Sequence, residues 1–92
     1  MADSYGSASV VSSAGGTAII ANLTSRRTSL IYNNGTAIVY IGFDSSVTIS
    51  NGIPLLPQAS IELGGAFTSR KKAIYGIAAS GTQDVRYMTW DA

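Results

Sequence analysis

Residues 47–63, VTISNGIPLLPQASIEL, restrict the possible fold more than any other stretch of the sequence. Apolar and polar residues alternate at both ends of it, which is the period of a β-strand with one buried face. Asn51-Gly52 is a turn signal, and Pro54 and Pro57 exclude a helix. We therefore expect strands at 47–50 and 59–63, a positive φ at Gly52, and an irregular crossover in which Leu55 packs inward.

Short apolar runs separated by turn residues continue along the rest of the chain. We expect further strands at 17–22, 26–33, 36–43, 70–79 and 83–90, with a hairpin turn at Asn34-Gly35 between the second and third of them. The 36–43 run is apolar on both faces, which indicates a central strand or a strand whose outer face meets a partner.

Residues 1–16 differ from the rest because they are mostly small and polar. They are expected to form an extended N-terminal arm with a weak strand around 8–12. Residues 1–15 are expected to be mobile until they lie on a neighbour. Residues 17–92 are then a single domain. The fold class predicted is all-β: a compact antiparallel β-sandwich or small barrel of about seven to eight short strands.

Charge is scarce in this chain. Charged residues make up 12% of the 92 residues and apolar residues 46%, whereas soluble domains usually carry about 25% charged residues. A surface this poor in charge is expected to be covered in part by a partner. The net charge of +1 does not indicate a nucleic-acid partner. No apolar run approaches the roughly 20 residues of a membrane-spanning helix. The polar start, MADSYGSAS, does not have the pattern of a signal peptide, and we expect none.

The residue types needed for most catalytic chemistry are missing or scattered. The sequence has no His and no Cys, which removes histidine bases, thiol nucleophiles and the usual zinc sites. The acidic residues are spread over turns, termini and strands, so no carboxylate pair is indicated. A dyad of Ser69 with Lys71 or Lys72 is disfavoured, because Ser is common here and the side chains point to uncertain faces. We expect no enzyme activity and no cofactor.

Two groups of residues are candidates for contact with a partner. Arg70-Lys71-Lys72 is the densest charge cluster, suited either to an acidic surface or, as the favoured alternative, to a solvated strand edge. The aromatic residues could form a sugar-binding platform, but their alternation favours core packing. Trp90 either plugs the end of the sandwich or anchors in a partner. The candidate partner-binding residues are Ile38, Tyr40, Arg70, Lys71, Lys72 and Trp90.

Several of these motifs occur together in a known pattern. An Arg precedes a strand that ends in Asn, from Arg27 to Asn33; "VYIG" follows at 39–42, the stretch 47–63 comes next, and "IYGIAASGTQDVR" covers 74–86. The arrangement over about residues 26–90 resembles small virion proteins of tailed bacteriophages. Residues 1–25 lie outside the resemblance, and the motifs that carry it are turn and strand signals.

The resemblance implies a non-enzymatic structural protein of the virion. The expected role is a capsid decoration (cement) protein that binds the major capsid protein or another virion protein, assembled in the host cytoplasm and located on the capsid surface. A homo-oligomer is expected, with a trimer as the natural number at threefold points of a shell. The alternative is a head–tail or tail-fibre component that acts as a receptor- or glycan-binding β module.

Overall fold

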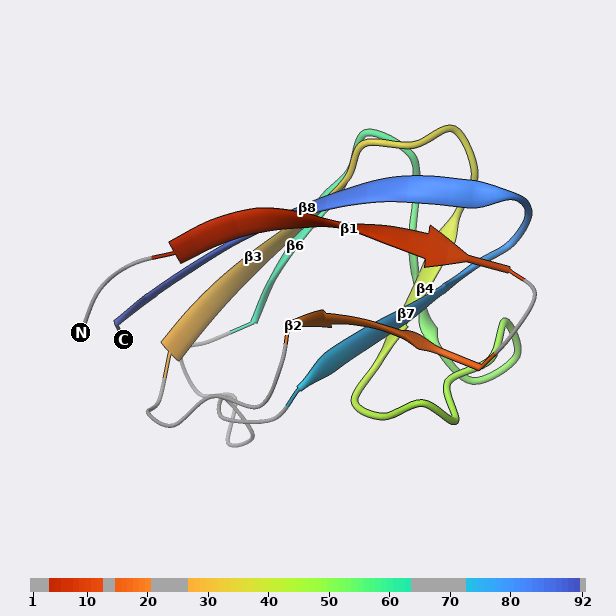
Figure 1. Ribbon diagram of the computed structural model, residues 1–92, viewed down its shortest axis with the longest axis horizontal. Helices are drawn as coiled ribbons and strands as arrows, with labels where there is room; N and C mark the ends of the chain where they lie inside the picture. Colours follow the sequence, from red (N-terminus) through yellow and green to blue (C-terminus); the bar gives the residue numbers. More distant parts are fainter. Residues whose placement is uncertain (1–3, 13–14, 21–26, 64–72, 92) are drawn as a thin grey trace.

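The computed structural model describes residues 4–12, 15–20, 27–63 and 73–91, which form two four-stranded antiparallel sheets packed as a small β-sandwich (Figure 1). Sheet A has the order β1-β8-β3-β6, and sheet B has the order β2-β7-β4-β5. The strands of sheet A are β1 (Ser4–Val11), β8 (Thr82–Asp91), β3 (Arg27–Asn33) and β6 (Ser60–Leu63). Those of sheet B are β2 (Thr17–Ile20), β7 (Ile74–Ala78), β4 (Val39–Gly42) and β5 (Ile53–Leu55). The all-β prediction is confirmed.

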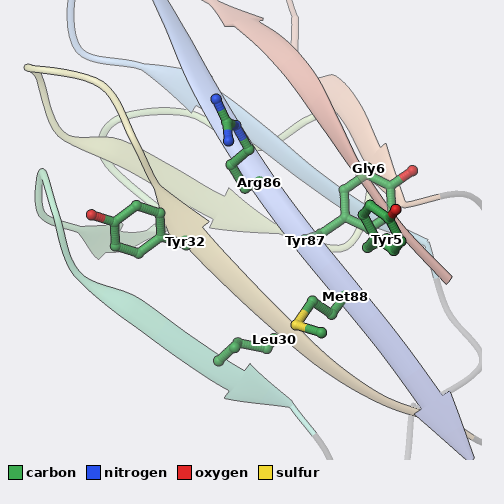
Figure 2. A pocket seen from close by; sticks show the side chains of 7 residues that line it. All are labelled: Tyr5, Gly6, Leu30, Tyr32, Arg86, Tyr87 and Met88. Carbon is green, nitrogen blue, oxygen red and sulfur yellow. The ribbon is translucent and has the colours of Figure 1, made fainter. Parts of the chain in front are cut away.

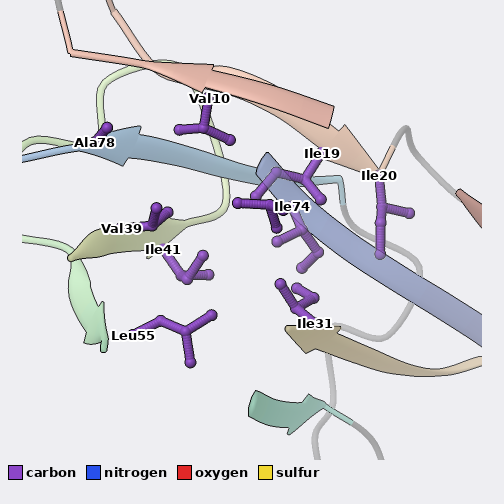
Figure 3. Close-up of a cluster of buried hydrophobic side chains, with 10 residues drawn as sticks. Val10, Ile19, Ile20, Ile31, Val39, Ile41, Leu55, Ile74 and Ala78 are labelled. Carbon is purple, nitrogen blue, oxygen red and sulfur yellow. The ribbon is translucent and has the colours of Figure 1, made fainter. Parts of the chain in front are cut away.

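The core between the sheets is aliphatic (Figure 3). Every strand except β6 contributes a buried side chain to it, and Ile61 and Leu63 of β6 pack against its margin. Branched side chains suit a narrow space between two pleated sheets, because they fill it with few rotamers. The buried cluster consists of Val10, Ile19, Ile20, Ile31, Val39, Ile41, Leu55, Ile74, Ala78 and Val85.

The N-terminal segment is a strand of the sandwich, so the prediction of a separate arm over 1–16 is wrong for residues 4–11. β1 pairs with β8 along its whole length, from Ser4 opposite Thr89 to Val11 opposite Thr82. Val10 is fully buried in the core. The small polar residues gave no apolar pattern from which this strand could be predicted. The strand is held chiefly by backbone hydrogen bonds to β8, with one side chain buried in the core. Residues 1–3 and 13–14 lie outside the described part of the chain.

The expected hairpin at Asn34-Gly35 is also wrong, because this turn carries the chain from sheet A to sheet B. β3 pairs with β6 and β8, whereas β4 pairs with β5 and β7. Gln83 fastens the crossover: its Oε1 accepts hydrogen bonds from the backbone N–H groups of Thr36 at 2.7 Å and Ala37 at 3.2 Å. A Cβ at Gly35 would collide with this Gln83 oxygen, so glycine is needed for close approach to a side chain.

The stretch 47–50 is a compact turn, contrary to the strand expected there, and the strand of this region is β5. Val47 is 5% exposed and turns inward, and a Cβ at Gly16 or Gly42 would lie 2.7 Å from one of its side-chain atoms. The hydroxyl of Thr48 accepts hydrogen bonds from the N–H groups of Ser50 and Asn51, both at 3.2 Å. Such side-chain bonds to local backbone compete with strand pairing.

Gly52 and Pro54 differ from expectation in instructive ways. The positive φ expected at Gly52 is wrong: among the described residues, positive φ occurs at Gln58 (66°) and Gly81 (60°). Position 52 requires glycine because a Cβ there would lie 2.7 Å from Cβ of Tyr40. Pro54 lies within β5, opposite Tyr40, where an edge strand tolerates a missing N–H. The inward position of Leu55 is confirmed, with 4% exposure.

Candidate functional site

The predicted partner-binding residues do not form one site. Tyr40 lies on β4, a central strand of sheet B as predicted, and is half-buried on the outer face opposite Ile77 and Pro54. Ile38 precedes β4, is half-buried, and its carbonyl accepts a hydrogen bond from the N–H of Ala79 at 2.8 Å. Trp90 is half-buried on β8 of the other sheet, opposite Thr28. Arg70, Lys71 and Lys72 lie outside the described residues.

Six aromatic residues that the structure describes test the core-packing prediction, which is wrong for most of them. Phe43 is 40% exposed. Tyr32, Tyr40, Tyr75, Tyr87 and Trp90 are half-buried, and of the six only Tyr87 packs against the buried cluster. Aliphatic side chains make up the buried cluster between the sheets, and Tyr87 packs at its margin.

One hollow lies on the outer face of sheet A, and we call it the β8 groove (Figure 2). It has a volume of about 370 Å³. Tyr5 of β1 and Tyr32 of β3 lie on the two sides of β8, with Arg86 toward one end and Met88 and Leu30 toward the other. The lining consists of Tyr5, Gly6, Leu30, Tyr32, Arg86, Tyr87 and Met88.

Strand pairing explains why these residues meet. Met88 is opposite Tyr5 on one side and Leu30 on the other, which makes one row across three strands. Arg86 is opposite Tyr32, which starts the next row. Tyr5 is 83% exposed and Met88 50% exposed, so the groove presents large apolar surface to solvent. Arg86, Met88 and Trp90 alternate along β8 and so share one face. The pairing of β8 with β1 and β3 adds the two tyrosines to this face.

Two polar networks hold the sides of the β8 groove. The hydroxyl of Tyr32 donates a hydrogen bond to Oε1 of Gln58, and the N–H of Gln58 donates to the carbonyl of Asn33 at 2.7 Å. In the other network, Oδ2 of Asp84 accepts from Nε of Arg86 at 3.0 Å and from Nδ2 of Asn34 at 2.9 Å. The Asn34 hydrogen bond and then the Arg86 hydrogen bond lower the pKa of Asp84, so this solvent-accessible carboxylate stays charged at neutral pH.

A second hollow of about 400 Å³ lies at the end of sheet B beside the β4–β5 connection, and we call it the β4–β5 hollow. Exposed apolar side chains gather in this part of the sequence: Phe43 at 40%, Ile49 at 57%, Ile53 at 58% and Leu56 at 56%. Phe43 and Ile53 line the hollow itself. The full lining consists of Ile41, Gly42, Phe43, Asp44, Ser46, Val47, Asn51 and Ile53.

Local hydrogen bonds give the β4–β5 connection a defined shape. Oδ1 of Asp44 accepts from the N–H of Ser46 at 3.0 Å, and Oδ1 of Asn51 accepts from the N–H of Thr48 at 2.7 Å. The carbonyl of Ser45 accepts from the N–H of Gly16 at 3.0 Å, which ties the connection to the start of β2. The exposed apolar side chains of this connection therefore lie on turns of defined shape. Hydrogen bonds from side chains or from a neighbouring segment hold these turns in place.

The described residues contain no cluster of three or more His, Cys, Asp or Glu side chains placed to hold a metal ion. In the same part of the chain, no helix has the length and apolar character needed to cross a membrane. Comparisons with protein-family models, with curated proteins and with solved structures find no significant match to this chain. The two hollows and the exposed apolar residues are the features of the described chain that indicate a function.

Proposed function

We propose that this protein is a non-enzymatic structural component of a bacteriophage particle, a capsid decoration protein that binds the shell through apolar surface. The observation that carries the proposal is the exposed apolar surface of the stretch 43–56, from which Phe43 and Ile53 line the β4–β5 hollow. Phe43, Ile49, Ile53 and Leu56 are each at least 40% exposed, yet they all come from the single stretch 43–56. Large apolar groups gathered in this way mark sites of protein association.

The charge distribution supports the same conclusion. Asp44 is the single charged residue in the lining of the β4–β5 hollow, and its carboxylate is engaged by Ser46. Buried centres of protein interfaces are depleted in charge and enriched in aromatic residues, because charged groups lose hydration when a partner covers them. The resemblance of residues 26–90 to small phage virion proteins supplies the kind of partner, the major capsid protein or another virion protein.

The β-sandwich itself suits this role. A decoration protein must remain folded on an exposed particle surface, and a sandwich with two antiparallel sheets closes its core without cofactor or disulfide; this chain contains no Cys. Homo-oligomerisation, with a trimer as the expected number, belongs to the same proposal. It would bring several copies of the hollow to one site on a shell and raise the apparent affinity without new contacts.

Copy number on the particle tests the proposal. Purified virions of the phage that encodes this chain are expected to contain the protein in numbers comparable to the shell subunits. Quantitative mass spectrometry provides the ratio, and a few copies per particle would indicate the head–tail or fibre role instead. Absence of the protein from purified virions would refute a structural role.

A pair of variants locates the contact. Ile53→Ser removes an exposed apolar side chain from the β4–β5 hollow and is expected to weaken co-sedimentation with particles lacking the protein. Ser7→Ala, on the opposite sheet and exposed, is the matched control and is expected to bind as the wild type does. Equal binding by both variants would show that the hollow is not the contact.

A further inference from the structure

The β8 groove is built differently from the β4–β5 hollow, and its chemistry indicates a different occupant. Arg86, Met88 and Trp90 occupy alternate positions of β8 on one face, so they follow one another at about 6.8 Å. Met88 has Tyr5 on one side and Leu30 on the other in the same row of the sheet. The outer surface of β8 thus carries the Asp84–Arg86 ion pair at one end and apolar side chains along the rest.

Arg86 is the charged residue in the lining of the groove. Its side chain is 60% exposed, and Asp84 engages the Nε atom. Within the part of the chain that the structure describes, this is the one polar contact of Arg86, so its two terminal nitrogens can bind a carboxylate in bidentate fashion. Asp84 partly compensates the charge of Arg86 from outside the lining, and Glu62 lies opposite Leu30. Arg86 is nevertheless the charged side chain that lines the groove itself, and its guanidinium donates only.

We propose that the β8 groove binds an extended peptide segment of a partner protein in which an apolar side chain and an acidic side chain are two residues apart. An extended segment has the same repeat as β8, so a side chain seated between Tyr5, Met88 and Leu30 places the second one, about 6.8 Å away, beside Arg86. The hydrogen bond from Tyr32 to Gln58 orients the Tyr32 ring at the side of the groove, so this part of the binding surface is preorganised.

The inference rests on the proposed function for the identity of the partner, since a virion protein would supply the segment. Its test does not depend on the particle. The probe is the peptide acetyl-Thr-Phe-Thr-Glu-Thr-amide, compared with the same peptide carrying Gln in place of Glu and with both peptides in reversed order. Trp90 is the single Trp of the chain, so its fluorescence reports binding on this face.

The Glu peptide is expected to bind about tenfold more tightly than the Gln peptide in one of the two orders, because a charge-assisted bond to Arg86 replaces a neutral one. In Arg86→Gln this tenfold difference is expected to vanish, which isolates the pairwise contact. Met88→Ser is expected to weaken both peptides alike. Ile53→Ser, in the β4–β5 hollow, is the matched control and should bind both peptides as the wild type does.

Three results would overturn the inference. The first is no change in Trp90 fluorescence, or in the NMR signals of the groove, at millimolar peptide. The second is equal affinity for the Glu and Gln peptides in the wild type. The third is a shift in the NMR signals of the groove residues on addition of a neutral oligosaccharide such as maltohexaose, with no shift on addition of peptide. That result would identify a glycan site. Near-ultraviolet circular dichroism of Arg86→Gln and Met88→Ser establishes that each variant is folded.

The two proposals can fail separately. Peptide binding that disappears in Arg86→Gln, together with absence of the protein from virions, would leave the groove established and the structural role refuted. Abundant protein on the virion with no peptide binding would do the reverse.

Discussion

Asn33 at the end of β3 offers the sharpest test of how the two sheets are joined. It is fully buried, and its side chain bonds to three separate backbone groups. Nδ2 donates to the carbonyls of Ala37 and Leu55, both at 2.9 Å, and Oδ1 accepts from the N–H of Gly35 at 2.9 Å. Asn33 thereby links β3 of sheet A to the crossover and to β5 of sheet B.

Replacement by Ala removes all three bonds without supplying new partners. Each is worth about 1 kcal/mol net, and the Leu55 carbonyl left unpaired in the interior adds about 1–2 kcal/mol. The expected loss for Asn33→Ala is therefore about 4–5 kcal/mol in the free energy of unfolding. This is a large fraction of the roughly 5–14 kcal/mol typical of a domain of this length. The measurement is urea denaturation followed by Trp90 fluorescence, with the loss read from the midpoint at unchanged slope.

Two further variants serve as controls for Asn33→Ala. Asn34→Ala removes an exposed bond to Asp84 and is expected to cost less than about 1 kcal/mol. Asn33→Asp keeps the acceptor for Gly35 but turns a second acceptor toward the two carbonyls, so at pH 7 it should destabilise at least as much as Asn33→Ala. If the free energies of unfolding of Asn33→Ala and Asn34→Ala differ by less than about 1 kcal/mol, the proposed link between the sheets is refuted.

Four other expectations follow from the fold. Leu55→Ala should lower the free energy of unfolding by about 2–5 kcal/mol, measured in urea, because the side chain is buried. Gly52→Val should cost about 1–3 kcal/mol through collision with Tyr40, and an unchanged melting temperature would contradict that account. Deletion of residues 4–11 should abolish cooperative unfolding in calorimetry, whereas a separate arm would leave it intact. Since the pKa of Asp84 is lowered in the folded state, its stabilising contribution is full above the unfolded carboxyl pKa of about 4 and is lost as pH falls through the lower folded value; acid denaturation of Asp84→Asn should lack that component.

The alternation of side chains along the chain determines which residues share a face of the long strands. Ile31 faces inward and Leu30 outward on β3, and Val85 and Met88 divide in the same way on β8. The inward position of Leu55 also followed from sequence, because a large apolar residue between two prolines needs a buried site. Period-two patterning is a local property, and one buried face is sufficient to fix it.

Pairing between distant strands was not predictable in this way. Asn34-Gly35 has the residues of a hairpin, yet Asn33 and Gln83 direct the chain to the other sheet. β1 has little apolar character of its own, and its place depends on backbone bonds to β8, which lies near the opposite end of the chain. The β8 groove depends on the same pairing, since Tyr5 and Leu30 flank Met88 only after β1 and β3 are in register. Local preference sets which side chains share a face, whereas the neighbours across that face are set by the free energy of the whole packed sandwich.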